Sequence, residues 1–384
     1  MNNYSYKIQY VGESLALLNI LSHPAPYVST YMAESADKHG IVPGPEEKKL
    51  VEELSSIEED ARKEFKDDLE TIGYYFSSKG QFVISFVNIL FVNEGSSCPF
   101  DDIADNISVK DYKKYLSEID ENKYNKFFFQ MVKSIESNSS EGDDKEDVSS
   151  TEIFDAIFEA DLSDSDKLKL QKLYLHRDEH IEILFPLLER AAKIIKKHEK
   201  KLEAFGQRTI EYTKKEVGKE PFIEFIMRKL SSGDTTEENT YPKDSIIHIS
   251  YLQCSKISFS IRGDSLESSL PRVLIGAIFS DSLTFDSVIK NRNMLTEERA
   301  LTILKLLSDK SKLEILELTK NEAMYGAQLA NKLGLTTATI SHHTSALFDQ
   351  NLLHIEKVDS KIYFKQYQET IKALIRYLES TLLN

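Results

Sequence analysis

Residues 336–345 carry a run of short side chains that can both donate and accept hydrogen bonds. A helix predicted over residues 337–350 places most of them away from its apolar side, which Ile340 and Leu347 mark at a spacing of seven residues. The polar members are Thr336, Thr337, Thr339, Ser341, His342, Thr344 and Ser345. The first acidic side chain, Asp349, comes only at the far end of the helix. This composition favours a helix that enters the major groove of DNA, where a carboxylate would face phosphates and base acceptors.

A lysine-bearing hairpin is predicted directly after this helix. Two stretches that alternate between polar and apolar residues, 352–358 and 361–367, are separated by the short turn sequence Asp-Ser at 359–360. The lysines that line the two strands, and that can reach DNA phosphates, are Lys357, Lys361 and Lys365. Many exposed hairpins carry lysine, so this signal is the least specific of the set.

A possible metal motif occurs at residues 176–180, where His-Arg-Asp-Glu-His fits the H-x-x-E-H pattern of inverted zinc proteases. On a helix the two histidines, four residues apart, would share one face. A third ligand is not evident, and the adjacent charges equally suit the solvated start of a helix. We therefore predict no catalytic residue, no metal site and no cofactor. An enzyme within residues 1–290 stays open as an alternative, which metal analysis of the purified protein would test.

Other motifs of enzymes and nucleotide-binding proteins are missing from the sequence. The 14 glycines never form a G-x-G pair, and no G-x-S-x-G elbow is present. The two cysteines, Cys98 and Cys254, have neither metal-site spacing nor a disulfide framework. These absences argue against a Rossmann oxidoreductase, a P-loop nucleotidase and an α/β-hydrolase.

Further elements must hold the polar helix and the hairpin in place. Three helices are predicted ahead of the polar helix, over residues 296–307, 311–319 and 327–333. The second should bury Leu313, Ile315, Leu316 and Leu318. The third ends at Gly334, which takes a left-handed C-cap most easily, and Thr336 suits the N-cap of the next helix. Three helices, a polar fourth helix and a hairpin together predict a winged helix-turn-helix domain over residues 293–384.

The domain is predicted to close with a helix over residues 369–382. Its apolar stripe consists of Ile371, Leu374, Ile375, Leu378 and Leu382. A module of this size has little core to cover such a stripe, so we expect it to meet the first helix of a second subunit.

Residues 1–292 are predicted to form a large N-terminal α+β domain, so the chain as a whole belongs to the α+β class and is mainly helical. Helical periods dominate up to about residue 230, and β-branched alternating stretches predict strands within 244–290. Residues 6–10 suit a short strand before a helix, and Pro186 should kink or restart the helix that contains it. Residues 81–92 suit a buried helix and a buried strand equally well.

The charge of the protein is unevenly distributed. Residues 136–150 form a predicted acidic, mobile loop, and residues 231–244 a second solvated loop. From Leu295 onward eleven basic residues balance eleven acidic ones, so the net charge of −15 lies entirely in residues 1–294. The negative charge of residues 1–294 would repel DNA, which could approach only the neutral C-terminal module. A neutral module in turn gains little non-specific affinity for DNA.

The bulk composition indicates a folded cytoplasmic protein. A chain of 384 residues with 41% hydrophobic residues suits two or three domains with real cores. No stretch approaches the roughly 18 apolar residues of a membrane span, and the N-terminus lacks the basic start and cleavage site of a signal peptide. Two unpaired cysteines agree with a reducing compartment.

Residues 306–364 resemble the ArsR family of winged-helix repressors. Two parts of this stretch are specific: LSDKSKLEIL resembles the opening helix pair of the family, and LGLTTATISHHTSALFDQNLL resembles its helix-turn-helix. The resemblance covers about 90 residues. It implies a homodimer joined through the terminal helices of the module, with one recognition helix from each subunit on a half-site of an inverted repeat in double-stranded DNA. By matching position, it gives as DNA contacts Thr337, Thr339, Ser341 and His342.

The sequence departs from the metal-sensing members of that family. Where these carry a cysteine pair on the third helix, this chain has Tyr325 and Ala327, and its terminal helix has no histidine. Thiolates or imidazoles are needed to hold a soft or borderline ion. We therefore expect neither of those sensing sites here.

The leading hypothesis is a dimeric, sequence-specific DNA-binding regulator and not an enzyme. Repression is what the resemblance implies, and residues 1–292 would serve as a sensing or protein-interaction part with an unknown effector. The alternative is a protein-interaction scaffold whose winged helix no longer binds DNA, which the neutral charge of the module favours.

Overall fold

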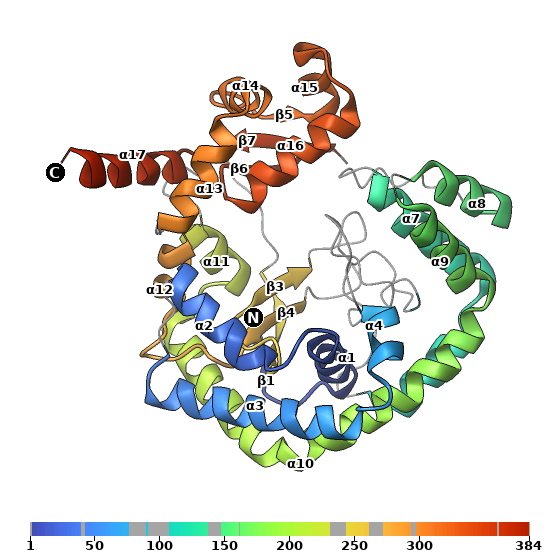
Figure 1. Ribbon diagram of the computed structural model, residues 1–384. Coiled ribbons are helices and arrows are strands. Elements are labelled where there is room, and N and C mark those ends of the chain that lie inside the picture. Colours follow the sequence, from blue (N-terminus) through green and yellow to red (C-terminus); the bar gives the residue numbers. More distant parts are fainter. Residues whose placement is uncertain are drawn as a thin grey trace. The chain divides into compact units, whose positions relative to one another are not determined.

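The computed structural model describes residues 2–39, 43–76, 90, 107–136, 147–160, 162–230, 243–260, 272–292, 297–358 and 361–383. The chain divides into two compact units, coloured along the sequence in Figure 1. The first consists of Met1–Ala36, Ile41–Phe127 and Leu168–Val288, and the second of Asp37–Gly40, Phe128–Lys167 and Ile289–Asn384. Both are mainly helical with one small sheet, in agreement with the predicted class, whereas the domain boundary at residue 292 stays a prediction. Among the described residues, every helix is too short or too polar to cross a membrane.

One long helix of the first unit, α10 (Arg177–Val217), contacts several of its other helices. Its buried side includes Leu184, Leu188, Ile195 and Leu202, at steps of four and seven residues that place them on one side of an amphipathic helix. The other helices that belong wholly or partly to this unit are α1 (Tyr10–Leu21), α2 (Tyr27–His39), α3 (Pro45–Glu64), α4 (Leu69–Phe76), α6 (Val109–Ser117), α7 (Glu121–Glu136), α9 (Asp164–Leu175), α11 (Phe222–Leu230) and α12 (Phe285–Arg292).

Pro186 does not restart the helix, contrary to that part of the prediction, because α10 continues through it for 41 residues. A proline removes one N–H bond and crowds the preceding turn. Here the neighbouring side chains Phe185, Leu187 and Leu188 are all buried, and this packing holds the helix together across the proline.

A four-stranded sheet completes the first unit. Its strands are β1 (Asn2–Ser5), β2 (Ser245–Ser250), β3 (Ile257–Ser260) and β4 (Arg272–Gly276), in the spatial order β1-β2-β4-β3. β1 and β4 pair parallel to β2, and β3 pairs antiparallel to β4. The strand predicted at residues 6–10 is therefore wrong: the paired residues are Asn2–Ser5, and Tyr10 already begins α1. The chain leaves the sheet at Tyr6, whose carbonyl accepts a hydrogen bond from Tyr251 instead.

Two buried glutamates tie together parts of the first unit that are far apart in sequence. Glu13 on α1 accepts hydrogen bonds from the backbone N–H groups of Tyr251 and Leu252, at 2.8 Å each. Glu58 on α3 accepts from the N–H groups of Tyr27 and Val28, at 2.7 and 2.8 Å. Each carboxyl group thereby fixes the position of one segment: the chain after β2 and the first turn of α2.

The second unit contains the winged helix-turn-helix elements together with α8 (Ser150–Glu159). The elements after residue 296 are α13 (Glu297–Leu307), α14 (Lys310–Leu318), β5 (Met324–Tyr325), α15 (Gly326–Leu333), α16 (Thr337–Asp349), β6 (Leu353–Val358), β7 (Lys361–Gln366) and α17 (Gln368–Leu382). Ala300, Ile303, Ile315, Leu316 and Leu329 are among the residues of their shared core.

Some predictions fall outside the described residues or differ from the structure. Residues 81–89 and 91–92, 137–146, 231–242 and 359–360 are not described, so the predictions for the ambiguous apolar run, the body of both polar loops and the hairpin turn stay untested. Leu313 was predicted to be buried, but 42% of it is exposed. It lies on the outer side of α14, two residues before the buried Ile315.

Gly276 at the end of β4 provides a test of the packing around the chain after β2. A Cβ at this position would overlap the carbonyl group of Cys254, which is backbone and cannot turn aside. We expect Gly276→Ala to lower the free energy of unfolding by about 2 kcal/mol or more in urea titrations. The control is Gly73→Ala in α4, where a Cβ meets nothing within 4 Å and removal of a helical glycine should add about 0.5–1 kcal/mol. Equal stabilities of the two variants would contradict the packing.

Glu13 predicts a specific dependence of stability on pH. Burial raises the pKa of Glu13 to about 7, although its two N–H partners favour the charged form. The folded state thus holds a proton that the unfolded state releases above about pH 4.5, so stability should fall as the pH rises from about 4.5 through 7, by on the order of 3 kcal/mol. Urea titrations at several pH values would measure this slope, and Glu13→Gln should flatten it. An unchanged slope in the variant would show that another group is responsible.

Candidate nucleic-acid interface

The start of α16 is fixed by two local features. Gly334 ends α15 in the left-handed conformation, with φ 64° and ψ 29°, as predicted. Thr336 is the N-cap: its Oγ1 accepts a hydrogen bond from the N–H of Thr339 at 3.1 Å and lies 2.8 Å from the Thr339 Oγ1. The turn between α15 and α16 is thus fixed by a glycine C-cap and a threonine N-cap, both of which can be recognised in the sequence.

One side of α16 holds the helix on the module. Ile340 and Leu347 are fully buried, as predicted, and α16 contacts α14, α15 and β6. Thr344 departs from the prediction of an outward polar side chain, because none of its surface is exposed. Its Oγ1 donates to the carbonyl of Ile340 at 2.9 Å, one turn earlier. A threonine hydroxyl that is satisfied by its own helix can be buried at little cost, so Thr344 belongs to the core.

The opposite side of α16 presents the polar residues that the sequence singles out. Thr336, Thr337 and His342 are exposed, whereas Thr339, Ser341 and Ser345 are half-buried. The structure therefore brings these six predicted site residues together on the first two and a half turns of one helix. The acidic Asp349 is the last residue of that helix, several turns away from the N-cap.

The two adjacent histidines face different surroundings. His342 is exposed, while His343 is half-buried, and their rings meet edge to face with centroids 5.8 Å apart. Burial, and then the positive charge of Lys312, lower the pKa of the His343 imidazole. His343 is therefore held in its neutral form on the module, and His342 is the imidazole that solvent reaches.

Beneath His343 lies an ion pair that the sequence analysis missed. Lys312 on α14 is only 8% exposed, and its Nζ lies 3.2 Å from Asp309 Oδ2. Asp309 also caps α14 by accepting the Lys312 N–H at 3.1 Å, and this N–H bond is the main reason why the pKa of Asp309 is lowered. The available signal was the aspartate directly before a helix, a common N-cap.

The hairpin forms as predicted where the structure describes it. β6 and β7 pair antiparallel from Leu353 opposite Gln366 to Val358 opposite Lys361, and β5 adds Met324 and Tyr325 to the outer side of β7. The side chains of Lys357 and Lys361 lie outside the described residues, so their positions are not assigned, whereas Lys365 is half-buried.

The H-x-x-E-H residues have partners within the protein. His180 Nδ1 lies 2.6 Å from the hydroxyl of Tyr75, and His176 Nδ1 lies 3.1 Å from Glu179 Oε1. Burial lowers the pKa of His180. Among the described residues, no group of three or more His, Cys, Asp and Glu side chains has the arrangement of a metal site.

Known proteins resemble part of this chain. No protein-family model matches the chain. The arsenical resistance operon repressor of Staphylococcus aureus is 32% identical over 77 residues, which are 20% of this chain and 74% of the repressor. The chain belongs to the ArsR family of winged helix-turn-helix regulators. The likeness spans about a fifth of the chain.

Solved structures of related regulators cover the same share of the chain. NolR from Sinorhizobium fredii is 30% identical and matches 22% of this chain and 85% of its own length, with a TM-score of 0.19. Reduced HlyU from Vibrio cholerae is 21% identical and matches 23% of this chain and 92% of its own length, also with a TM-score of 0.19.

Two helices of the winged helix-turn-helix module carry apolar side chains that the rest of the module leaves exposed. On α17, Leu374 is buried, but Ile375 is 50% and Leu382 73% exposed. On α13, Leu301 is 52% exposed. The stripe predicted on the terminal helix is thus divided between the core of the module and an open apolar surface.

The N-cap of α16 gives a direct test of this geometry. Replacing Thr336 by Ala removes the acceptor for the Thr339 N–H and should destabilise the module by about 1 kcal/mol. Thr336→Ser keeps the hydroxyl and serves as the matched control. Hydrogen exchange of the α16 amides, read by mass spectrometry, should speed up in the alanine variant alone. Equal exchange in both variants would rule out the cap.

Proposed function

We propose that this protein is a sequence-specific DNA-binding transcriptional regulator that acts in the cytoplasm as a dimeric repressor. One observation carries the proposal: α16 is anchored by Ile340 and Leu347 and turns a polar, acid-free surface outward over its first two and a half turns. The family supports it, because the Staphylococcus relative is by its name an operon repressor.

The outward side chains suit the reading of base edges. Hydroxyls such as those of Thr337 and Ser341 can donate to or accept from any base, and the exposed His342 can do either according to its tautomer. The proposed contacts of the recognition helix are Thr336, Thr337, Thr339, Ser341, His342 and Ser345. Lys357 and Lys361 on the hairpin would contact phosphates and so fix the register of the helix on the duplex.

The open apolar surface supports the dimer. Ile375 and Leu382 on α17 and Leu301 on α13 would be covered by the same helices of a second subunit, since apolar side chains of this size gain free energy when they leave water. A two-fold dimer presents two recognition helices to an inverted repeat whose half-sites lie one helical turn apart, roughly 34–36 Å.

The metal-binding positions known from the family do not control DNA binding in this proposal. Tyr325 and Ala327 stand at the cysteine-pair positions, and the ring of Tyr325 packs edge to face on Tyr363 with centroids 5.6 Å apart. A phenol and a methyl group do not replace two thiolates. We infer that any effector acts through residues 1–292, as a sensing or protein-interaction part.

A selection from random duplex DNA tests the proposal. We expect the full-length protein to enrich an inverted repeat, and gel-shift titrations should give a higher dissociation constant for Ser341→Ala and for His342→Ala. A lost base contact costs about 1–3 kcal/mol, which corresponds to roughly 5- to 150-fold. Ser117→Ala, on α6 of the first unit, should bind like the wild type. Enrichment of no inverted repeat would overturn the proposal.

The second candidate is a protein-interaction scaffold, which the balance of eleven basic and eleven acidic residues in the module favours. The double substitution Lys357→Glu and Lys361→Glu separates the two. A DNA-binding regulator should lose operator affinity and cellular regulation together, whereas a scaffold should keep its cellular function.

A further inference from the structure

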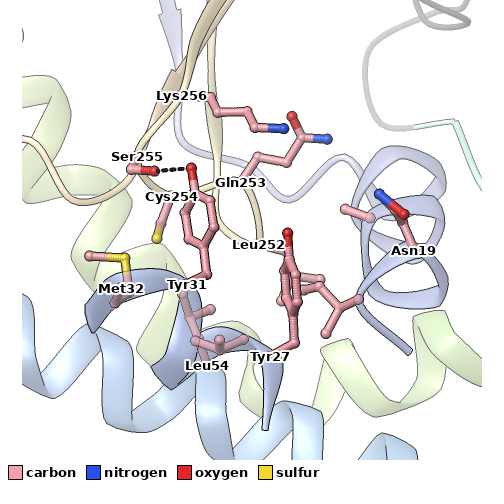
Figure 2. Close-up of a pocket in the computed structure, with 13 residues that line it drawn as sticks. Asn19, Tyr27, Tyr31, Met32, Leu54, Leu252, Gln253, Cys254, Ser255 and Lys256 are labelled. Carbon is pink, nitrogen blue, oxygen red and sulfur yellow. Dashed lines mark hydrogen bonds between the residues drawn. The ribbon is translucent and has the colours of Figure 1, made fainter. Parts of the chain in front are cut away.

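A small pocket in the first unit lies between α1, α2, α3 and the chain that follows β2 (Figure 2). Its volume is about 50 Å³. One water needs roughly 10–15 Å³ of such space, so the pocket has room for about three to five waters or for a ligand segment with as many non-hydrogen atoms. The residues of α1, α2 and α3 that line it are Ala16, Asn19, Ile20, Tyr27, Val28, Tyr31, Met32 and Leu54, and Leu252–Lys256 complete the wall.

The walls of the pocket are held in place by the two buried glutamates. Glu13 binds the N–H of Leu252, which is a lining residue, and Glu58 binds the N–H groups of Tyr27 and Val28, which are two more. Arg62 forms an ion pair with Glu58 at 2.7 Å and so holds this carboxylate in position. The pocket is therefore preformed, which reduces the entropy that a ligand must lose on binding.

The inner part of the pocket is apolar and aromatic. The rings of Tyr27 and Tyr31 stack with centroids 5.8 Å apart, one turn apart on α2, next to Ile20 and Leu54. The Tyr31 hydroxyl lies 3.2 Å from Ser255 Oγ and links α2 to the opposite wall. Burial raises the pKa of Tyr27, so its hydroxyl stays protonated and can donate a hydrogen bond.

The outer part of the pocket carries polar groups with a positive bias. Figure 2 shows the side-chain ends of Asn19, Gln253 and Lys256 beyond the tyrosine rings. Among the described residues no Asp or Glu lines the pocket, and within the same part of the chain the Lys256 ammonium group has no ion pair or hydrogen bond. Lys256 is exposed, and an ammonium group without a partner at the outer part of an apolar pocket suits a carboxylate.

The sulfur groups in the wall indicate that the pocket binds a ligand without reacting with it. Cys254 is buried, and burial raises the pKa of its thiol to about 12. The thiol therefore stays neutral and lacks the nucleophilic and metal-binding character of a thiolate. Together with Met32, it adds apolar, polarisable surface to the inner part of the pocket.

We propose that this pocket binds a small organic anion, a short-chain carboxylate whose hydrocarbon part contacts Tyr27 and Tyr31 and whose carboxylate is bound by Lys256. The pocket holds about three to five non-hydrogen atoms, which suits a hydrocarbon part of about three carbons with the carboxylate outside it at the exposed Lys256. Binding at this site is independent of whether α16 binds DNA, and it gives the first unit a ligand of defined chemistry.

Butyrate and butyramide test the proposal, because they have the same size and shape and differ in charge. Ligand-observed NMR titrations with the full-length protein should give a dissociation constant at least about tenfold lower for butyrate than for butyramide. Lys256→Met should remove this preference. Lys219→Met, an exposed lysine after α10 that does not line the pocket, should leave it unchanged.

A filling substitution tests the location. Asn19 is exposed on α1 at the pocket, so Asn19→Trp should fold and abolish binding of both compounds. The comparison of the two compounds on the wild type needs no variant at all. Equal affinities for butyrate and butyramide, no binding of butyrate, or butyrate binding that survives both Lys256→Met and Asn19→Trp would overturn the proposal. The titrations contain no DNA, so a failure of the DNA-binding proposal leaves their outcome unaffected.

Discussion

The first unit depends on carboxyl groups that are buried and satisfied by backbone N–H donors. Removing a carboxylate from water is costly unless hydrogen bonds replace its hydration. Glu13 and Glu58 each accept two N–H groups from a segment distant in sequence: residues 251–252 for Glu13, and residues 27–28 for Glu58. At Glu13 the cost of burial still outweighs these bonds, so the pKa of its carboxyl group is raised. The walls of the small pocket follow from these two anchors, because the donated N–H groups belong to its lining residues or their neighbours.

The winged helix-turn-helix was largely predictable because local signals mark its boundaries. A glycine that favours the left-handed conformation and a threonine suited to an N-cap place the turn at Gly334 and Thr336, and the structure has both. What the sequence did not reveal is which polar groups turn inward. Thr344 and Lys312 are buried because their own helix or Asp309 satisfies them, and such compensation becomes visible only when the helices are packed.

The first unit was harder to predict because its defining contacts are not local. β1 pairs parallel with β2, a partner about 240 residues away, so nothing near residue 2 indicates a strand there. The helical periods predicted up to about residue 230 agree with the helices that the structure describes there, since amphipathic spacing is a local property. Pro186 shows the limit of a local rule, because the packing of its neighbours maintains the helix.

The pairing of β1 with β2 also constrains the order of events during synthesis. Asn2 lies opposite Ser245, so β1 has no partner until some 240 further residues have been made. At ribosomal rates of roughly 5–20 residues per second, this interval lasts about 12–50 s. Throughout that time the edge of β1 is unpaired in a nascent chain. The sheet of the first unit can form completely only shortly before the helices of the winged helix-turn-helix module are translated.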